Sequence, residues 1–203
     1  TAIKPQKNKK RVNVYLDDKF GFGLDLETFV KLGMKTEQEL TDAQVGKIVK
    51  EAEFQKIYDK LLRFSTLRPR SEKELKGWLK RYKVHLSLHK GLFNRLKHLD
   101  LLNDNNFAKW WVEQRVSFRP TTKKVLSYEL AAKGIVKNTI EDVLSKIEID
   151  EEKNAKSLLK KKAYRWQKLP ELEKRKKMSE FLARKGFGWG SIKKAIDDIF
   201  KID

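Results

Sequence analysis

The stretch ELAAKGIVKNTIEDVLSKI (residues 129–147) returns in altered form as FLARKGFGWGSIKKAIDDI (residues 181–199). Matching positions are offset by 52 residues, among them the glycines Gly134 and Gly186. Each glycine follows a lysine that ends an apolar-periodic segment. That is the position of a helix C-cap glycine, because glycine adopts the left-handed conformation without a Cβ penalty. The repeat therefore predicts a helix-to-helix turn with a positive φ at both glycines.

The glycine-rich run after Lys185 has a second interpretation, a loop that cradles a phosphate. A Walker loop would end in Gly-Lys-Ser/Thr, whereas Gly190 is followed here by Ser191 and Ile192. A dinucleotide-binding loop would follow a strand, but the preceding KRKKMSEFLAR (residues 174–184) is charged and helix-like. Since the upstream copy shares only one of these glycines, the turn is the favoured interpretation.

A third, more diverged copy lies upstream in SEKELKGWLKRY (residues 71–82), where Leu79 precedes Leu130 by 51 residues. Its apolar side chains fall on one helical face: Leu75, Trp78, Leu79 and Tyr82. Ser71 and Glu74 have the spacing of a capping box, which predicts where this helix begins. Its turn lacks the Lys-Gly pair, and we expect it to be about three residues longer and to run through KVHLSLHKG (residues 83–91), before Leu92, Leu96 and Leu99 restore the apolar stripe.

Each copy has room for three helices of about 12 to 15 residues. The nine predicted helices cover residues 45–66, 71–82, 89–100, 104–118, 121–133, 138–148, 151–167, 171–185 and 190–201. Asp104 and Thr139 are the expected N-caps of two of them. We therefore predict a mainly α fold in which three tandem three-helix repeats (45–101, 102–149 and 150–203) form a curved, elongated solenoid.

The first 44 residues have a different pattern. In RVNVYLDDKFGFGL (residues 11–24), apolar residues alternate on both sides of Asp17-Asp18. These residues are Val12, Val14, Leu16, Phe20, Phe22 and Leu24. Alternation with a period of two around a short polar turn predicts a β-hairpin. Because an isolated hairpin is marginal, we expect this N-terminal extension (1–44) to pack against LETFVKLG (26–33) or the first repeat.

The charge of the chain points to an anionic partner. Its 203 residues include 47 Lys and Arg against 28 Asp and Glu, a net charge of +19. Residues 1–44 hold 8 basic and 7 acidic residues, so almost all of the excess lies in the repeats. Self-repulsion of this size opposes the compact state, and an anion relieves it. Nucleic acid is the first candidate, with an acidic protein assembly or a membrane surface as alternatives.

The absence of cysteine removes disulfides, thiolate chemistry and zinc–thiolate sites together. No run approaches the roughly 18 apolar residues of a membrane span. The basic N-terminus lacks the apolar core of a secretory signal, and it begins with Thr1, so the native start can be missing. We expect a cytoplasmic protein without membrane contact.

Basic residues gather in four clusters spread over every repeat, which favours a continuous basic track over a single pocket. Part of this charge, within residues 157–178 in particular, is also accounted for as the solvated face of helices. The predicted contacts with a partner or nucleic acid are Arg68, Arg70, Lys73, Lys80, Arg81, Arg115, Arg119, Lys123, Lys124, Lys160, Lys161, Lys162, Arg165, Trp166, Arg175, Lys176, Lys177, Arg184, Trp189 and Lys193.

The two tryptophans among these contacts are candidates for stacking on unpaired bases. Trp189 lies in a polar glycine turn and is the better candidate for exposure, followed by Trp166, which adjoins Arg165. Trp78 and Trp110 sit in apolar stripes and are expected in the core.

Two features suggest metal chemistry only weakly. His85 and His89 have the i, i+4 spacing of helical metal ligands, but no third ligand is evident. Acidic pairs such as Asp197-Asp198 could suggest a nuclease, yet adjacent residues face different sides of a helix and a two-metal site needs converging carboxylates. We expect no cofactor, no metal and no catalytic activity, and we keep a nuclease as an alternative to be tested.

Several motifs resemble those of the RecX family of RecA modulators. They are RPRSEKEL (68–75), LNDNNFA (102–108), ELAAKGI (129–135) and FLARKGF (181–187), and their order and spacing cover residues 45–203. The hairpin extension is similar to that of RecX proteins from Gram-positive bacteria. The chain departs from the family pattern by the missing glycine of the first turn and by SFRPTTKK (117–124), where a Lys-Gly pair often precedes the middle helix.

The resemblance implies a nine-helix fold that docks in the helical groove of the RecA filament on single-stranded DNA. It also implies that RecA ATP hydrolysis, strand exchange and co-protease activity are restrained there, by a protein expected to be a monomer. The charge alone implies an anion, and only the resemblance names it. A DNA- or RNA-binding helical-repeat protein without a recombinase partner is the alternative that the residues leave open.

Overall fold

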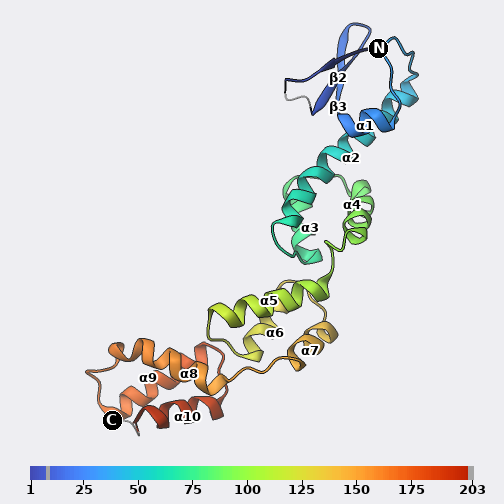
Figure 1. Ribbon diagram of the computed structural model, residues 1–203. Coiled ribbons are helices and arrows are strands. Elements are labelled where there is room, and N and C mark those ends of the chain that lie inside the picture. Colours follow the sequence, from blue (N-terminus) through green and yellow to red (C-terminus); the bar gives the residue numbers. More distant parts are fainter. Residues whose placement is uncertain (8–9, 201–203) are drawn as a thin grey trace. The chain divides into compact units, whose positions relative to one another are not determined.

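The computed structural model describes residues 1–7 and 10–200, within which the chain forms three strands and ten α-helices (Figure 1). The strands are β1 (Ala2–Pro5), β2 (Arg11–Leu16) and β3 (Lys19–Asp25). The helices are α1 (Leu26–Lys31), α2 (Asp42–Thr66), α3 (Glu72–Arg81), α4 (Leu86–His98), α5 (Asp104–Phe118), α6 (Lys123–Ala132), α7 (Lys137–Ser145), α8 (Glu151–Lys162), α9 (Glu171–Arg184) and α10 (Trp189–Phe200), with a short 3-10 segment, η1 (Ala163–Arg165), after α8. The predicted mainly α fold with three successive groups of three helices is confirmed.

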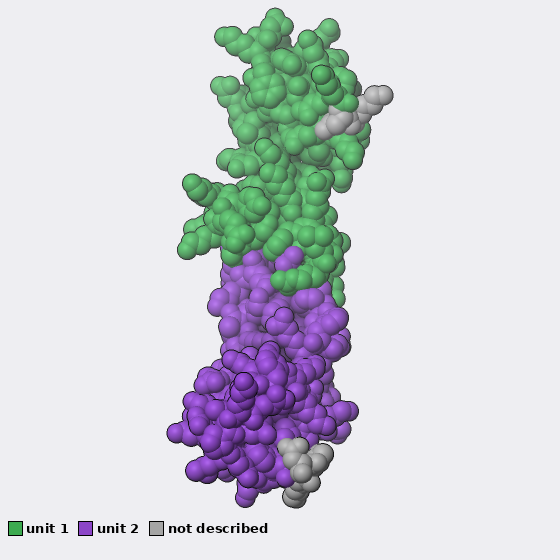
Figure 2. All heavy atoms as spheres, turned by 90° about the vertical axis from the view of Figure 1, so that its left-hand side faces the viewer, with its two compact units in different colours: residues 1–68, 77–101 green, residues 69–76, 102–203 purple. Residues whose placement is uncertain are grey.

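The contacts between residues divide the chain into two compact units, coloured green and purple in Figure 2. Unit 1 comprises Thr1–Arg68 and Gly77–Leu101, and unit 2 comprises Pro69–Lys76 and Leu102–Asp203. Helix α3 therefore starts in unit 2 and ends in unit 1. The division into four parts that the sequence suggests stays a proposal.

The N-terminal part is a three-stranded antiparallel sheet in the order β1-β2-β3, so the predicted hairpin is extended by one strand. The buried face of the sheet carries Val12, Val14, Phe22 and Leu24. These side chains form one core with Ile48 and Ala52 from the first half of α2. Helix α2 thus begins at the sheet, and only its later part belongs to the first three-helix group.

The predicted alternation fails at one residue of the hairpin. Phe20 is 60% exposed, although the period of two places it beside Phe22. The pairing register shifts between Val14 and Tyr15, where the strand partners change from Val14–Phe22 to Tyr15–Phe20. The extra residue, Gly21, turns Phe20 to the other face, where its ring meets Tyr15 edge-on at 6.0 Å between centroids.

The glycine turns are confirmed. Gly134 has a φ of 86° and Gly186 a φ of 85°. After Gly134 the amide of Ile135 donates to the carbonyl of Leu130, and Phe187 donates in the same way to Leu182. These bonds are those of a Schellman motif, which satisfies carbonyls at the end of a helix.

The turn after α3 was predicted to be longer, and that prediction is wrong. Val84 donates to Leu79 over the same spacing, and Lys83 takes the glycine position with a φ of 52°. Helix α4 therefore begins at Leu86 and not near residue 89. A lysine can occupy a left-handed position at an energetic cost, so the motif survives without its usual residue.

Two predicted N-caps are also wrong. Helix α5 is capped by Asn103, whose side chain accepts from the amides of Asn105 and Asn106. Helix α7 has Val136 at its N-cap, without a side-chain cap, so Thr139 lies inside the helix. Asp104 has a different role, which is described below.

Candidate nucleic-acid and partner interface

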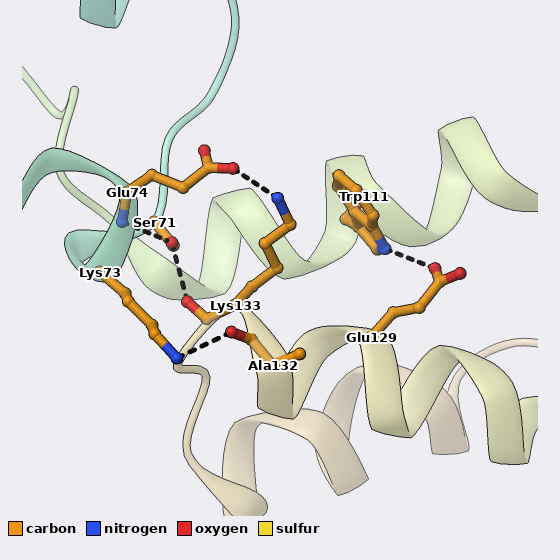
Figure 3. Close-up of polar contacts among 7 residues, drawn as sticks. All are labelled: Ser71, Lys73, Glu74, Trp111, Glu129, Ala132 and Lys133. Carbon is orange, nitrogen blue, oxygen red and sulfur yellow. Dashed lines mark hydrogen bonds and ion pairs between the residues drawn. The ribbon is translucent and has the colours of Figure 1, made fainter. Parts of the chain in front are cut away.

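Lys73, one of the predicted contacts, lies in a joint within unit 2, between the start of α3 and the end of α6 (Figure 3). The Ser71 hydroxyl donates to the carbonyl of Lys133 at 2.9 Å and accepts from the amide of Glu74 at 3.2 Å. Lys133 Nζ pairs with Glu74 Oε1 at 2.7 Å, and Lys73 Nζ donates to the carbonyl of Ala132 at 3.0 Å. The positive end of one helix therefore meets the negative end of another, which is favourable.

A second joint in unit 2 repeats this geometry between the start of α6 and the end of α9. The Thr122 hydroxyl accepts from the amide of Val125 at 3.2 Å and donates to the carbonyl of Gly186 at 3.2 Å. In both joints a carboxylate from the first helix of the next three-helix group, α5 or α8, also binds the first amide of the middle helix. Asp104 accepts from Glu72 at 2.8 Å, and Glu151 accepts from Lys123 at 3.1 Å.

The turn glycines are required by packing as well as by backbone conformation. A Cβ at Gly134 would lie 2.8 Å from Lys73 Cβ, and one at Gly186 would lie 2.4 Å from Val125 Cγ2. Both distances are far below van der Waals contact, so a side chain would force the helix ends apart. Lys73, an expected partner contact, is thus also part of a joint.

Arg115 is used inside the second three-helix group. Its Nε and terminal nitrogen donate to the two carboxylate oxygens of Glu129 on α6, at 2.8 and 2.5 Å. Trp111 Nε1 donates to the same carboxylate at 2.9 Å, and Lys133 Nζ lies 4.8 Å from the centre of the Trp111 ring. A bidentate, half-buried arginine positions α5 against α6. We therefore leave Arg115 out of the contact surface proposed below.

In the third three-helix group, acidic side chains are used for internal contacts. Residues 150–200, all of which the structure describes, contain eight acidic residues, and seven of them cap a helix, bind an amide or form an ion pair. Lys194 pairs with Glu152 at 2.6 Å and Lys156 with Asp198, which joins α10 to α8. Arg175 donates hydrogen bonds to Glu171 and to Asp197, which raise the pKa of its guanidinium in that order of size, and the bond to Asp197 joins α9 to α10.

The remaining cations of this group have no ion pair within residues 150–200 of the structure. Those that were predicted as contacts are Lys160, Lys161, Lys162, Arg165, Lys176, Arg184 and Lys193. All are exposed except Lys162, which is half-buried with its Nζ 5.9 Å from the centre of the Tyr164 ring. Lys177 lies 3.9 Å from Glu180.

The other predicted contacts differ in exposure. Arg119 and Lys124 are exposed, and Lys123 is half-buried. Lys80 and Arg81 are exposed in the last turn of α3, in unit 1. Arg68 and Arg70 are half-buried near the start of that helix.

Two tryptophans were predicted to be exposed, and the prediction is confirmed for Trp189 and wrong for Trp166. Trp189 is 70% exposed at the start of α10. Trp166 is only 7% exposed and packs edge-on against Phe181 with ring centres 5.5 Å apart. The prediction rested on its polar neighbours in sequence, whereas the ring belongs to the core of the third three-helix group, with Met178, Phe181 and Leu182. Trp78 and Trp110, expected in the core, are half-buried.

The histidine pair has structural contacts. His85 is the N-cap of α4 and accepts from the amide of Ser87, while His89 lies 3.1 Å from the carbonyl of Val84. Within residues 1–7 and 10–200 no group of three or more metal-binding side chains comes together. Over the same residues, no helix combines the length and apolar character that crossing a bilayer requires.

The arrangement described so far defines a class: a basic helical-repeat protein in whose third three-helix group most acidic side chains form internal contacts, while many of the basic ones stay exposed. Three sequence models of one family match the chain: the Regulatory protein RecX N-terminal domain over residues 1–41, the second three-helix domain over 103–144 and the third over 150–196. The chain belongs to the RecX family.

Known relatives span most of its length. The chain is 33% identical to the regulatory protein RecX of Bacillus subtilis, over 98% of this chain and 76% of the relative. It is 32% identical to a RecX of Clostridium perfringens, over 93% of this chain and 90% of the relative. A crystal structure of a regulatory protein RecX superposes with a TM-score of 0.74 at 23% identity, covering 100% of this chain and 98% of the other, and supports the fold.

Proposed function

We propose that this protein binds the RecA filament on single-stranded DNA and lowers RecA ATPase, strand-exchange and co-protease activity. Membership of the RecX family supports a regulatory role, since the relatives are named regulatory proteins. The RecA filament is the partner that the family resemblance implies, and it is a polyanion. The protein would act by binding in the cytoplasm, as a monomer and without a catalytic step, in DNA recombination and repair.

The observation that carries this proposal is the distribution of ion pairs in residues 150–200. Acids there are used for internal contacts, so the exposed cations keep their charge for an external partner. Phosphate groups are the ligands that a series of exposed Lys and Arg side chains binds through counterion release. Arg119 and Lys124 of the second three-helix group are exposed as well and belong to the same unit 2.

The test is the order of addition in a RecA ATPase assay. RecA is first assembled on single-stranded DNA until all DNA is covered, and the protein is then added at substoichiometric to equimolar ratios. We expect the ATPase rate to fall, because a bound protein that contacts several subunits opposes the motions of each hydrolysis cycle. Full-rate hydrolysis by preformed filaments in excess protein would contradict the proposal.

A charge-reversal variant tests whether Arg119 and Lys124 take part in the inhibition of RecA. Arg119→Glu with Lys124→Glu should weaken inhibition without lowering stability, because both side chains are exposed and lack an internal ion pair in the described part of the chain. Lys90→Glu with Lys109→Glu changes the same charge on exposed residues outside the predicted clusters and should inhibit like the unchanged protein.

The alternative function is sequence-independent binding of DNA or RNA without a recombinase. The excess of cations supports it equally well, so the assay must separate the two. Competition for bare DNA would slow RecA only when this protein is added before filament assembly. Binding to bare DNA with no preference for RecA-coated DNA would favour the alternative.

A further inference from the structure

Helices α9 and α10 border a groove whose chemistry differs from that of the basic clusters. The two helices pack against each other in the third three-helix group (Figure 1). The groove is lined by residues of both helices and has a volume of about 600 Å³. Ile192 and Ile196 are buried to 3% and 6% exposure and contribute apolar surface to its lining. The exposed Trp189 and Leu172 add two large apolar side chains.

The lining follows the periodicity of both helices. On α9 the lining residues include Leu172, Lys176 and Ser179, and on α10 they include Trp189 and Lys193. These steps of three and four residues select one face of each helix. Two parallel or antiparallel helical faces with an apolar surface between them form the kind of groove that accepts a third, amphipathic helix.

The charged side chains that line the groove indicate the charge of a ligand that would bind there. Arg175 pairs with Asp197 at 3.0 Å, and Glu180 lies 3.9 Å from Lys177, so both acids of the groove have a cation beside them. Lys176 and Lys193 are exposed, one on each helix, and neither forms an ion pair within residues 150–200. The charge left for a ligand is therefore positive on both sides of an apolar surface.

We propose that this groove binds an acidic amphipathic helix of a partner protein. Its apolar residues would contact Trp189, Ile192 and Ile196, and carboxylates on its two edges would meet Lys176 and Lys193. The groove is less suited to a nucleic-acid strand, because Ile192 and Ile196 of its lining are apolar and offer a sugar–phosphate backbone no hydrogen-bond donor. The inference does not depend on the RecA proposal, since it rests only on residues 172–197.

The test is selection of peptides on the full-length protein. A displayed library of helix-forming peptides of about 15 residues is long enough for an isolated helix to form in part. Binders are collected on the unchanged protein and then measured individually as synthetic peptides. We expect the selected peptides to share apolar residues at i, i+4 and i+7 and an excess of Asp and Glu.

Variants then assign the selected peptides to the groove. Trp189→Ala should lower the affinity of the selected peptides at least about tenfold, because a large aromatic side chain in an interface often carries a large share of the binding free energy. Lys176→Glu combined with Lys193→Glu should lower the peptide affinity to a similar extent. Lys90→Glu with Lys109→Glu, which reverses the same charge elsewhere, should leave affinity within about twofold. Circular dichroism of each variant checks that the fold is kept.

Three results would overturn the inference. The first is that no selected peptide depends on Trp189, and the second is that the selected peptides carry excess Lys and Arg. The third is that oligothymidine binds in a Trp189-dependent manner and displaces the peptides, which would make the groove a nucleic-acid site. Because RecA takes no part in these measurements, failure here leaves the ATPase test unaffected.

Discussion

At the scale of single residues, Lys83 shows how one turn tolerates the wrong side chain. It has a φ of 52° at the position that glycine occupies in the other two repeats. A left-handed residue with a Cβ costs about 1–2 kcal/mol, and glycine removes that cost while losing some entropy of its own. Lys83→Gly should therefore raise the free energy of unfolding by about 0.5–1 kcal/mol, measured by urea denaturation. An unchanged or lower value would contradict this account of the turn.

Gly186 is the opposite case, because both its backbone and its surroundings exclude a side chain. Its φ is 85°, and a Cβ would lie 2.4 Å from Val125 Cγ2. Gly186→Ala should lower the free energy of unfolding by about 2 kcal/mol, with loss of heat stability.

The matched control for that substitution is Gly77→Ala within helix α3. A Cβ at Gly77 meets nothing within 4 Å. Alanine should stabilise the helix there by about 0.5–1 kcal/mol. Equal losses at the two positions would contradict the account of Gly186, which combines its positive φ with the close approach to Val125.

At the scale of elements, the contact between α5 and α6 depends on one carboxylate. Glu129 accepts from Arg115 and from Trp111. Arg115→Glu would place two carboxylates together in a half-buried site and should lower stability by about 2 kcal/mol. Arg119→Glu, one turn further on and exposed, should change stability by less than about 0.5 kcal/mol. Thermal unfolding of the two variants separates an internal role from a surface role, and similar Tm values would remove Arg115 from the α5–α6 contact.

The helices were largely predictable, because apolar periodicity, the capping box and the glycine turns are local signals. The failures have long-range causes. Asp104 was expected to cap its own helix, but it binds the amide of Glu72, 32 residues earlier in the chain. The bulge that turns Phe20 outward depends on pairing with the neighbouring strand. Neither contact can be predicted from the spacing of residues that are close in sequence.

For the candidate site, the sequence predicted the positive charge but not which basic side chains are available to a partner. Composition identifies the excess of cations, but ion pairing decides which of them remain available, and pairing is a tertiary property. Arg175 and Lys176 are neighbours in sequence, yet only Arg175 pairs with Asp197. The α9–α10 groove was missed, although the steps of three and four residues on both helices could have indicated it.

At the scale of the whole molecule, salt tests the role of the exposed cations. Affinity for single-stranded DNA should fall steeply as salt rises, because each phosphate contact releases counterions. Lys160→Glu with Lys161→Glu should weaken binding and flatten the slope of log K against log salt by about 1.4, for two lost contacts. Lys162 is kept, because its half-buried side chain also packs near Tyr164.

Two results decide this prediction. The Lys90→Glu and Lys109→Glu control should keep the slope of the unchanged protein. Binding that does not respond to salt would show that apolar contacts dominate, and the exposed cations would then lose their assigned role.

The two joints of unit 2 have a consequence for how such a gene can change in length. Each joint is formed by a hydroxyl at the start of one middle helix and a carbonyl at the end of the next, at Ser71–Lys133 and Thr122–Gly186. A duplicated second repeat would therefore carry a hydroxyl for one joint and a carbonyl for the other, and insertion by unequal recombination would need no new type of contact. Duplication after the third repeat would not be neutral, since Pro170 at the N-cap of α9 has no hydroxyl to donate. Lineages that gain repeats should gain them internally, or acquire serine or threonine at that position first.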